Sequence, residues 1–374
     1  MPQKKKLILY LILTSSVFLG LMLNENSSGG SRIDHNYLLP YIIEFSQDFS
    51  SGLNLFVNNP GSLVHSPFFY IISGFLLKIF NNIFFVKILY LVVCSILPYI
   101  FYLILKTKYK VNYEYLFYIS LIIFLSPYFR SSAIWLLGDN LSIIFFSLSI
   151  LFFLKTLDNS KKLSNYYFCI FFLILCCYIR YYYFLFFFYF LFEFYKKLEI
   201  GDLIKIIFLS FIISIPEIIY LIYIIVNYDF VNFISERANG NYFTNFIVIF
   251  TILLFYLIPF FFIQFIDILK FYRSNLKNFF IIFSITILFF LTDRYFDDFI
   301  NFQSNLGGGV FVKFLKIFNY NLEIIFLVIF CFSFLLIDYI FRGNRIRNYI
   351  ILIILILCFP MPIIYQKYLD PLFF

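Results

Sequence analysis

Twelve apolar runs of 14 to 24 residues divide this chain of 374 residues from end to end. About 20 apolar residues in a helix cross the roughly 30 Å hydrocarbon core of a bilayer. Because 63% of the residues are hydrophobic and only 13% are charged, little sequence remains for a water-soluble domain. The sequence therefore predicts an all-α integral membrane protein, with residues 1–374 forming a single polytopic membrane domain. The runs are 7–23, 67–80, 83–105, 113–128, 141–157, 163–179, 181–195, 203–226, 244–265, 279–292, 322–341 and 348–365.

Basic residues mark one set of the loops between these runs. Loops rich in Lys and Arg favour the cytoplasmic side of a membrane. Because the net charge of +8 is dispersed over short loops, it does not indicate a nucleic-acid-binding surface. Six segments hold three basic residues each, 18 of the 28 in the chain: 4–6, 106–110, 155–162, 196–205, 270–277 and 342–347. We expect all six in the cytoplasm.

The number of crossings follows from these loops. An even number of spans must separate two cytoplasmic loops, but three apolar runs lie between 4–6 and 106–110. The run 67–80 covers only about 21 Å as a helix, so we expect it to lie in the outer interface. The same rule divides 163–195 into two spans with Arg180 at their outer tip. The prediction is about 11 transmembrane helices, with the N-terminus in the cytoplasm and the C-terminus outside.

The start of the chain, basic residues followed by the run 7–23, is typical of a signal peptide or of an uncleaved anchor. The length of this run favours the anchor. On either interpretation, the first external loop covers residues 24–82 and contains an amphipathic stretch. It holds an unusual share of polar residues, including both histidines of the chain.

Polar residues of the types used in catalysis and ligand binding gather in the segments expected on the external side. The first external loop contains Asp34, His35, Asp48 and the sequence His65-Ser66-Pro67. Asp139 and Arg180 are expected at the outer ends of later spans. The sequence has no GxxxxGK[ST] and no GxGxxG, so it does not indicate a nucleotide-driven pump. A site that faces outward between helices is therefore the first hypothesis.

This layout resembles the GT-C superfamily of membrane glycosyltransferases. The superfamily includes protein O-mannosyltransferases, aminoarabinose transferases and dolichyl-phosphoglucose-dependent glucosyltransferases. Its members carry a catalytic acid in the first external loop, then juxtamembrane helices and often an HPP-like motif. Asp34 matches the acid, and His65-Ser66-Pro67 departs from HPP at its middle position. Asp139 and Arg180 match an acidic and a basic residue of later outer turns.

A further match lies near the C-terminus, where YQKYLDP resembles the RY-containing segment of several such enzymes, with Lys367 in place of Arg before Tyr368. The resemblance implies a hexosyltransferase type of enzyme with its active site on the external face, in the cytoplasmic membrane of a bacterium. Its donor would be a polyprenyl-phosphate sugar and its acceptor a lipid-linked glycan, a lipid or a protein. Asp34 would be the catalytic base. The expected substrate-binding residues are His35, Asp48, His65, Asp139, Arg180, Lys367 and Tyr368.

The chemistry of transfer agrees with these residue types, since it needs a base beside the acceptor hydroxyl and positive charge beside the departing phosphate. Arg180 is the candidate for that phosphate because a guanidinium binds it through two parallel hydrogen bonds. A divalent metal requirement stays open. The alternative metal set, Asp34, His35, Asp48 and His65, lacks the spacing of a known metal motif.

A second class of function is a flippase, polymerase or other transporter of lipid-linked polysaccharide. Transporters usually contain internal repeats and ionisable residues near the middle of the membrane. The sequence contains no evident repeat, and its ionisable residues are biased toward one face. Glu217, beside Pro216 within a span, is either a satisfied polar group at a kink or part of a cavity.

Overall fold

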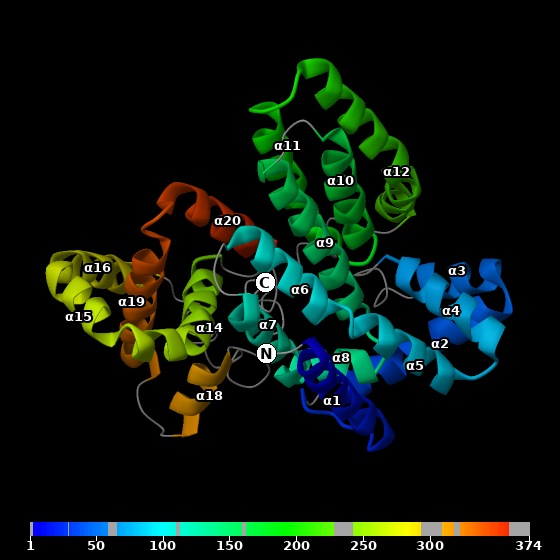
Figure 1. Cartoon of the computed structure of the whole chain (residues 1–374), viewed down its shortest axis with the longest axis horizontal. Coiled ribbons are helices and arrows are strands. Elements are labelled where there is room, and N and C mark those ends of the chain that lie inside the picture. The colour runs from blue at the N-terminus through cyan, green and yellow to red at the C-terminus, as the bar shows by residue number, and fades with distance from the viewer. Residues whose placement is uncertain are drawn as a thin grey trace. The chain divides into compact units, whose positions relative to one another are not determined.

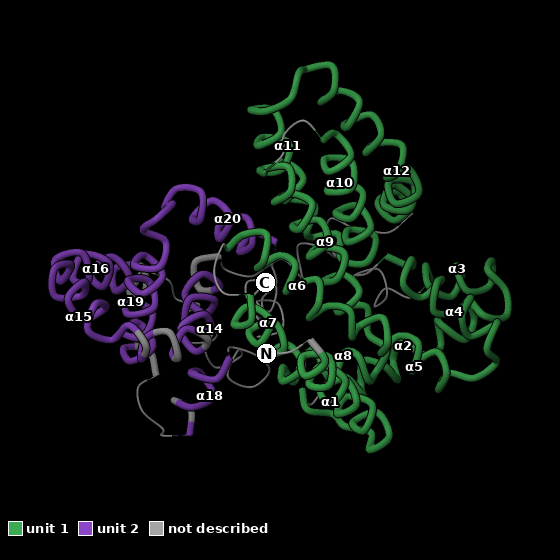
Figure 2. Tube along the Cα trace, viewed as in Figure 1, with its two compact units in different colours: residues 1–228, 374 green, residues 229–373 purple. Residues whose placement is uncertain are grey.

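The computed structural model describes residues 3–28, 30–58, 66–109, 113–158, 162–227, 242–292, 309–317 and 322–358. These ranges are helices joined by turns and contain no strand, which confirms the all-α class. The chain divides into two compact units, residues 1–228 with Phe374 and residues 229–373 (Figure 2). The prediction of one membrane domain over residues 1–374 stays a prediction.

The first unit carries Asp34, Asp139 and Arg180, which were singled out above, and its helices appear from blue to green in Figure 1. It comprises α1 (Gln3–Met22), α2 (Ser31–Gln47), α3 (Phe49–Val57), α4 (Phe68–Phe80), α5 (Ile83–Cys94), α6 (Leu97–Lys108), α7 (Tyr113–Leu121), η1 (Ile122–Leu125), α8 (Pro127–Ile134), α9 (Gly138–Asp158), α10 (Leu163–Cys177), η2 (Tyr181–Phe184), α11 (Leu185–Tyr195) and α12 (Ile200–Asn227).

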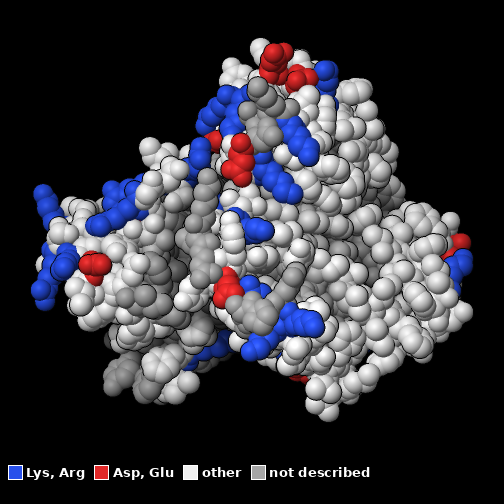
Figure 3. All heavy atoms as spheres, viewed as in Figure 1, with Lys and Arg blue, Asp and Glu red and all other residues white. Residues whose placement is uncertain are grey.

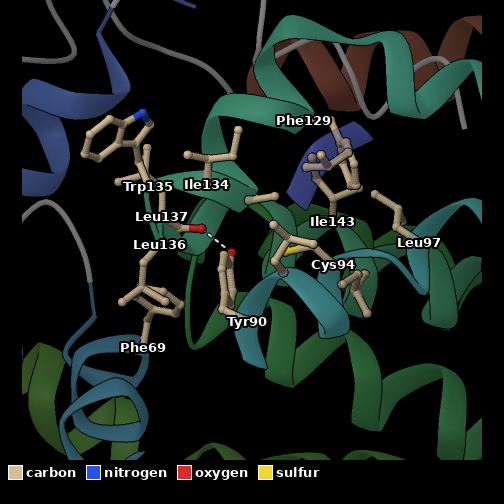
Figure 4. Close-up of a cluster of buried hydrophobic side chains, with 14 of the residues drawn as sticks. Phe69, Tyr90, Cys94, Leu97, Phe129, Ile134, Trp135, Leu136, Leu137 and Ile143 are labelled. Atoms are coloured by element: carbon tan, nitrogen blue, oxygen red, sulfur yellow. Dashed lines mark hydrogen bonds between the residues drawn. The ribbon is translucent and has the colours of Figure 1, made fainter. Parts of the chain in front are cut away.

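The core of this unit lies where α1, α2, α4, α5, α6, α8 and α9 meet. Helix α9 packs along α10 and α6, and α2 packs against α3 and α4. Figure 4 shows Tyr90 of α5 in the middle of buried side chains, with its hydroxyl donating to the carbonyl of Leu137. Cys94, fully buried one turn later, lies on the same face of α5. The turn after α8 is therefore anchored to α5 through a polar contact inside an apolar cluster.

Five helical segments are long and apolar enough to cross a membrane: 4–22, 83–108, 138–158, 200–226 and 324–341. The bent pair Tyr113–Leu125 and Pro127–Ile134 raises the number to six if it counts as one span. Shorter apolar helices occupy 68–80, 163–177, 245–255 and 276–288. These lengths support a membrane protein with at least five such helices among the described residues.

Two breaks in the helices bear on the predicted spans. A turn between α10 and η2 separates the two halves of 163–195 at Tyr178–Arg180, which confirms the predicted break. The run 113–128, predicted as one span, instead ends in a bend of 61° before α8. The reason is local: Pro127 excludes Ser126 from a helical conformation, and the Ser126 hydroxyl then caps α8 by accepting from the backbone of Phe129 at 3.3 Å.

The second unit comprises α14 (Tyr242–Ile263), α15 (Phe265–Ser274), α16 (Leu276–Thr292), α18 (Gly309–Ile317), α19 (Leu322–Phe341) and α20 (Arg345–Leu357). Helix α19 packs against α14 and α16. Ile268, Phe271 and Tyr272 of α15 bury an apolar face against Leu335 and Leu336 of α19. The segment 270–277, expected as a cytoplasmic loop, therefore begins within an amphipathic helix.

The surface agrees with a lipid environment. On the face in Figure 3, charged side chains gather in groups, and broad uncharged areas lie between them. Large apolar side chains such as Leu19, Phe208 and Phe211 are about 60% exposed, at 62%, 64% and 59%. Exposed apolar area on this scale is unfavourable in water and favourable against lipid chains.

An ion pair joins the end of α1 to α8. Arg130 donates from Nε to Glu25 Oε1 at 2.7 Å and from Nη2 to Glu25 Oε2 at 2.5 Å. Its remaining donors bond to the backbone oxygen and the hydroxyl of Ser16, both at 3.0 Å. The side chains of Arg130 and Glu25 are 17% and 25% exposed. A Cβ added at Gly20 would overlap Glu25 Oε2 and approach Arg130 Nη2, so a larger residue there would displace the pair.

We expect Arg130→Ala to lower the free energy of unfolding by about 3 kcal/mol, because Glu25 would keep a half-buried charge without its partner. Gly20→Ala should destabilise the protein by displacing the same pair. The measurement is the thermal midpoint in detergent. The control is Arg345→Ala, because Arg345 is 51% exposed in its pair with Asp338 and should contribute less than about 1 kcal/mol. Equal midpoints for Arg130→Ala and Arg345→Ala would contradict a structural role for the Glu25 pair.

Candidate functional site

The first turn of α2 places Asp34 and His35 on different sides of that helix. The helix begins after Gly30, whose carbonyl accepts from the backbone of Asp34 at 3.0 Å. Asp34 is exposed, whereas His35 is 3% exposed. Tyr41 follows Asp34 by two helical turns and so lies near the same face, where it packs against Tyr70 of α4 with ring centroids 6.0 Å apart. The face of α2 that carries Asp34 is thus directed toward α4.

The turn between α8 and α9 holds the only tryptophan of the sequence, Trp135. Leu136 follows it with φ of +52°, a left-handed conformation that is uncommon for a residue with a side chain. Leu137 is fixed by three hydrogen bonds: its carbonyl accepts from Tyr90 and, at 3.1 Å, from Ser132, and its backbone nitrogen donates to the Ser132 carbonyl at 3.1 Å. These contacts hold the strained turn in place.

Asp139 and Arg180 form an ion pair at the end of this turn. Arg180 Nη2 lies 2.5 Å and Nε 3.1 Å from Asp139 Oδ1. Both side chains are largely buried, at 13% and 19% exposed for Arg180 and Asp139. Burial by itself lowers the pKa of Arg180, but the charge of Asp139 outweighs it and the pKa lies above its ordinary value. Two residues singled out from the sequence, 41 positions apart, are therefore in contact.

Tyr70 brings Asp34 into relation with this ion pair. Its hydroxyl lies within the electrostatic range of Arg180, Asp139 and Asp34, and its ring is 4% exposed. We call Asp34, Tyr70, Asp139 and Arg180 the outer cluster. Sequence reasoning missed Tyr70 because it lies within the apolar run 67–80; its phenolic hydroxyl within that run was the available signal. The outer cluster combines one exposed carboxylate with an ion pair and a phenol.

Asp48 lies apart from the outer cluster and caps a helix. Its carboxylate accepts from the backbone nitrogen of Ser51 at 2.8 Å, at the N-terminus of α3. Asp48 follows His35 by thirteen positions, and the twelve residues between them are continuous helix, which corresponds to roughly 20 Å. One metal ion therefore cannot bind both of them in this arrangement. Among the described residues, no group of three His, Cys, Asp or Glu side chains is placed to hold a metal ion. His65, Lys367 and Tyr368 lie outside the described residues.

Glu217 of α12 contacts the segment that precedes α4. Its Oε2 accepts from the Ser66 hydroxyl at 2.8 Å, and its buried Oε1 has no hydrogen-bond partner. Pro216 interrupts the backbone hydrogen bonds of α12. The Tyr178 hydroxyl donates to the Ile213 carbonyl in the turn that Pro216 disrupts. Glu217 is thus a carboxyl group inside a helix long and apolar enough to cross a membrane, hydrogen-bonded to a residue just before α4.

His35 packs against Trp135, with ring centroids 5.7 Å apart. Burial lowers the pKa of His35 to about 4, with a further contribution from the positive charge of Lys87, while a hydrogen bond to the backbone of Trp135 acts in the opposite direction. The imidazole is therefore neutral at pH 7. Its Nδ1 is buried and has no hydrogen-bond partner.

Comparison with known proteins gives no further guide, because no family model, no curated protein and no solved structure matches this chain.

We expect acid to destabilise the fold through His35. Since the unfolded chain binds a proton near pH 6.5 and the folded protein only near pH 4, stability should fall by up to about 1.4 kcal/mol for each pH unit between these values. Emission from Trp135 during thermal unfolding measures the effect, and His35→Gln should flatten the pH dependence over this window. An unchanged slope in His35→Gln would exclude His35 as its source. A separate loss of stability is expected below pH 4.5. Arg130 lowers the pKa of Glu25 in the folded protein, so the unfolded chain binds a proton at Glu25 first as the pH falls.

Proposed function

We propose that this protein is a membrane glycosyltransferase, which moves a sugar from a polyprenyl-phosphate donor to a lipid-linked glycan, a lipid or a protein on the external face of a bacterial cytoplasmic membrane. The outer cluster is the observation that carries the proposal. It comprises an exposed carboxylate, Asp34, and the Asp139–Arg180 ion pair, whose charges all act on the buried hydroxyl of Tyr70. These residues come from four separate parts of the chain, as expected of a site built between helices.

Asp34 is the base of the proposed reaction. It takes the proton of the acceptor hydroxyl while the acceptor oxygen bonds to the anomeric carbon of the sugar, and the bond from that carbon to the phosphate oxygen breaks. The polyprenyl phosphate leaves with the bonding electron pair. Asp139 already balances the charge of Arg180, and we expect this pair also to hydrogen-bond sugar or acceptor hydroxyl groups. The phosphate role expected for Arg180 stays a prediction.

A transporter, flippase or polymerase of lipid-linked polysaccharide is the second candidate, and Glu217 is the observation in its favour. A carboxyl group inside a membrane helix, next to a proline and with one unpartnered oxygen, is typical of a transport pathway. Transfer of sugar and movement of lipid-linked glycan are separate measurements in reconstituted vesicles, so they distinguish the two candidates.

The decisive variant is Asp34→Asn, which keeps the size of the side chain but cannot accept the proton. Transfer of labelled sugar from polyprenyl phosphate should fall by about 10²–10⁴-fold, the usual contribution of a general base. Asp202→Asn is the matched control, because Asp202 pairs with Lys205 at the end of α12 expected in the cytoplasm. Wild-type transfer by Asp34→Asn would remove Asp34 as the base. Glycan movement without any sugar transfer by the wild-type protein would favour the transporter.

The proposed topology has 11 spans and is tested by single cysteines in a cysteine-free variant. Cysteines at Asn54 and Asn301 should react with an impermeant thiol reagent from outside, and one at Asn344 should not. External labelling at Asn344 contradicts the 11-span arrangement. A cysteine at Thr107, at the end of α6, tests whether α4 stays in the interface; labelling from outside there would mean that α4 crosses the membrane.

A further inference from the structure

The basic residues near the outer cluster differ in whether an acidic side chain balances them. Arg130 is paired with Glu25, and Arg180 with Asp139. Within the described part of the chain, neither Arg32 of α2 nor Lys87 of α5 forms an ion pair. Two positive charges therefore remain uncompensated in this region of the first unit.

Both of these charges lie against one side chain. Lys87 Nζ is 4.6 Å and Arg32 Cζ 5.8 Å from the centroid of the Trp135 ring. The indole attracts each cation through its ring electrons, but the two cations repel each other. An anion bound to both would remove this repulsion. Trp135, at the edge of the buried cluster in Figure 4, has its indole on the side away from Cys94.

The orientation of Lys87 separates this arrangement from ordinary interfacial anchoring. Lysines near the ends of membrane helices usually extend their ammonium group toward the headgroups and water. Lys87, one turn inside α5, instead places Nζ over a tryptophan that is only 6% exposed. Its charge also reaches His35, whose buried Nδ1 lacks a hydrogen-bond partner. The site thus combines the positive charge of Lys87 with the buried, unpartnered Nδ1 of His35.

The neighbouring surface suits a lipid. Phe84, which lies one turn before Lys87 on α5, is 37% exposed, and Phe85 is 53% exposed. Ile33, next to Arg32 on α2, is 71% exposed. A ligand with a phosphate group and hydrocarbon chains would place its charge between the two cations and its chains against these apolar side chains.

We propose that Arg32 and Lys87, held beside Trp135, bind the phosphate group of a membrane lipid. The proposal extends beyond sugar transfer and does not depend on it, since binding is measured without turnover. Arg32 binds phosphate through parallel hydrogen bonds, and Lys87 acts as a compact charge at the boundary of the membrane. Because Trp135 is the only tryptophan, its emission reports directly on this site.

The experiment is a fluorescence titration of the whole protein in phosphatidylcholine nanodiscs that contain increasing fractions of phosphatidate or of polyprenyl phosphate. A saturable change in Trp135 emission is expected with at least one of them. Lys87→Gln and Arg32→Gln should each weaken that binding by about 10- to 100-fold, and Lys87→Arg should retain most of it. Lys155→Gln is the matched control, because Lys155 Nζ lies 4.7 Å from the ring centroid of Phe152 in a similar contact.

Three results would overturn the proposal. The first is unchanged affinity in both Lys87→Gln and Arg32→Gln. The second is saturation by inorganic phosphate at the same concentration as by the lipid, which would indicate a soluble anion. The third is equal binding of uncharged polyprenol, which would mean that the phosphate is not recognised. Lipid binding by a protein without transferase activity would reject the proposed function and retain this site. Transferase activity in variants that no longer bind the lipid would retain the proposed function and show that this site does not bind the sugar donor.

Discussion

The ion pair between Glu25 and Arg130 positions α8 and the turn that follows it in the first unit. It joins the end of α1 to α8, and the backbone carbonyl of the same Glu25 accepts from Trp135 Nε1 at 2.8 Å. Glu25 therefore holds both Arg130 within α8 and the side chain of Trp135, which follows the end of α8. Because charges buried near a membrane are costly unless they are paired, this contact has few alternative arrangements. The positions of Trp135 and of the turn toward Asp139 depend on it.

The same charge balance divides the basic residues of this unit by role. Arg130 and Arg180 are each satisfied by a carboxylate, so they hold helices together and orient their partners. Arg32 and Lys87 retain charge that a ligand could balance. Residue type alone does not separate these roles, since Arg180 and Lys87 are both basic residues near the ends of helices. The distinction comes from which carboxylate the fold brings near each one.

Sequence reasoning predicted the features that depend on neighbouring residues. The apolar runs predicted α9, α12 and α19, and the length of 163–195 predicted the break at Arg180. The bend before Pro127 was missed because the apolar run continues through it to residue 128. The contact of Asp139 with Arg180 and the approach of Tyr70 were not predicted as contacts. They join residues far apart in the chain, and apolar periodicity carries no information on which ends of helices meet.

Leu136 shows how the fold maintains this arrangement. A left-handed conformation costs a residue with a side chain about 1–2 kcal/mol, and hydrophobic packing alone would favour a relaxed turn. The hydrogen bonds of Tyr90 and Ser132 to Leu137 oppose that relaxation from within the apolar cluster. As a result, the chain reverses sharply enough for Trp135 to face α2 and α5 while Asp139, four residues later, meets Arg180. The strained turn thus places Trp135, with Arg32 and Lys87 beside it, only a few residues before the Asp139–Arg180 ion pair.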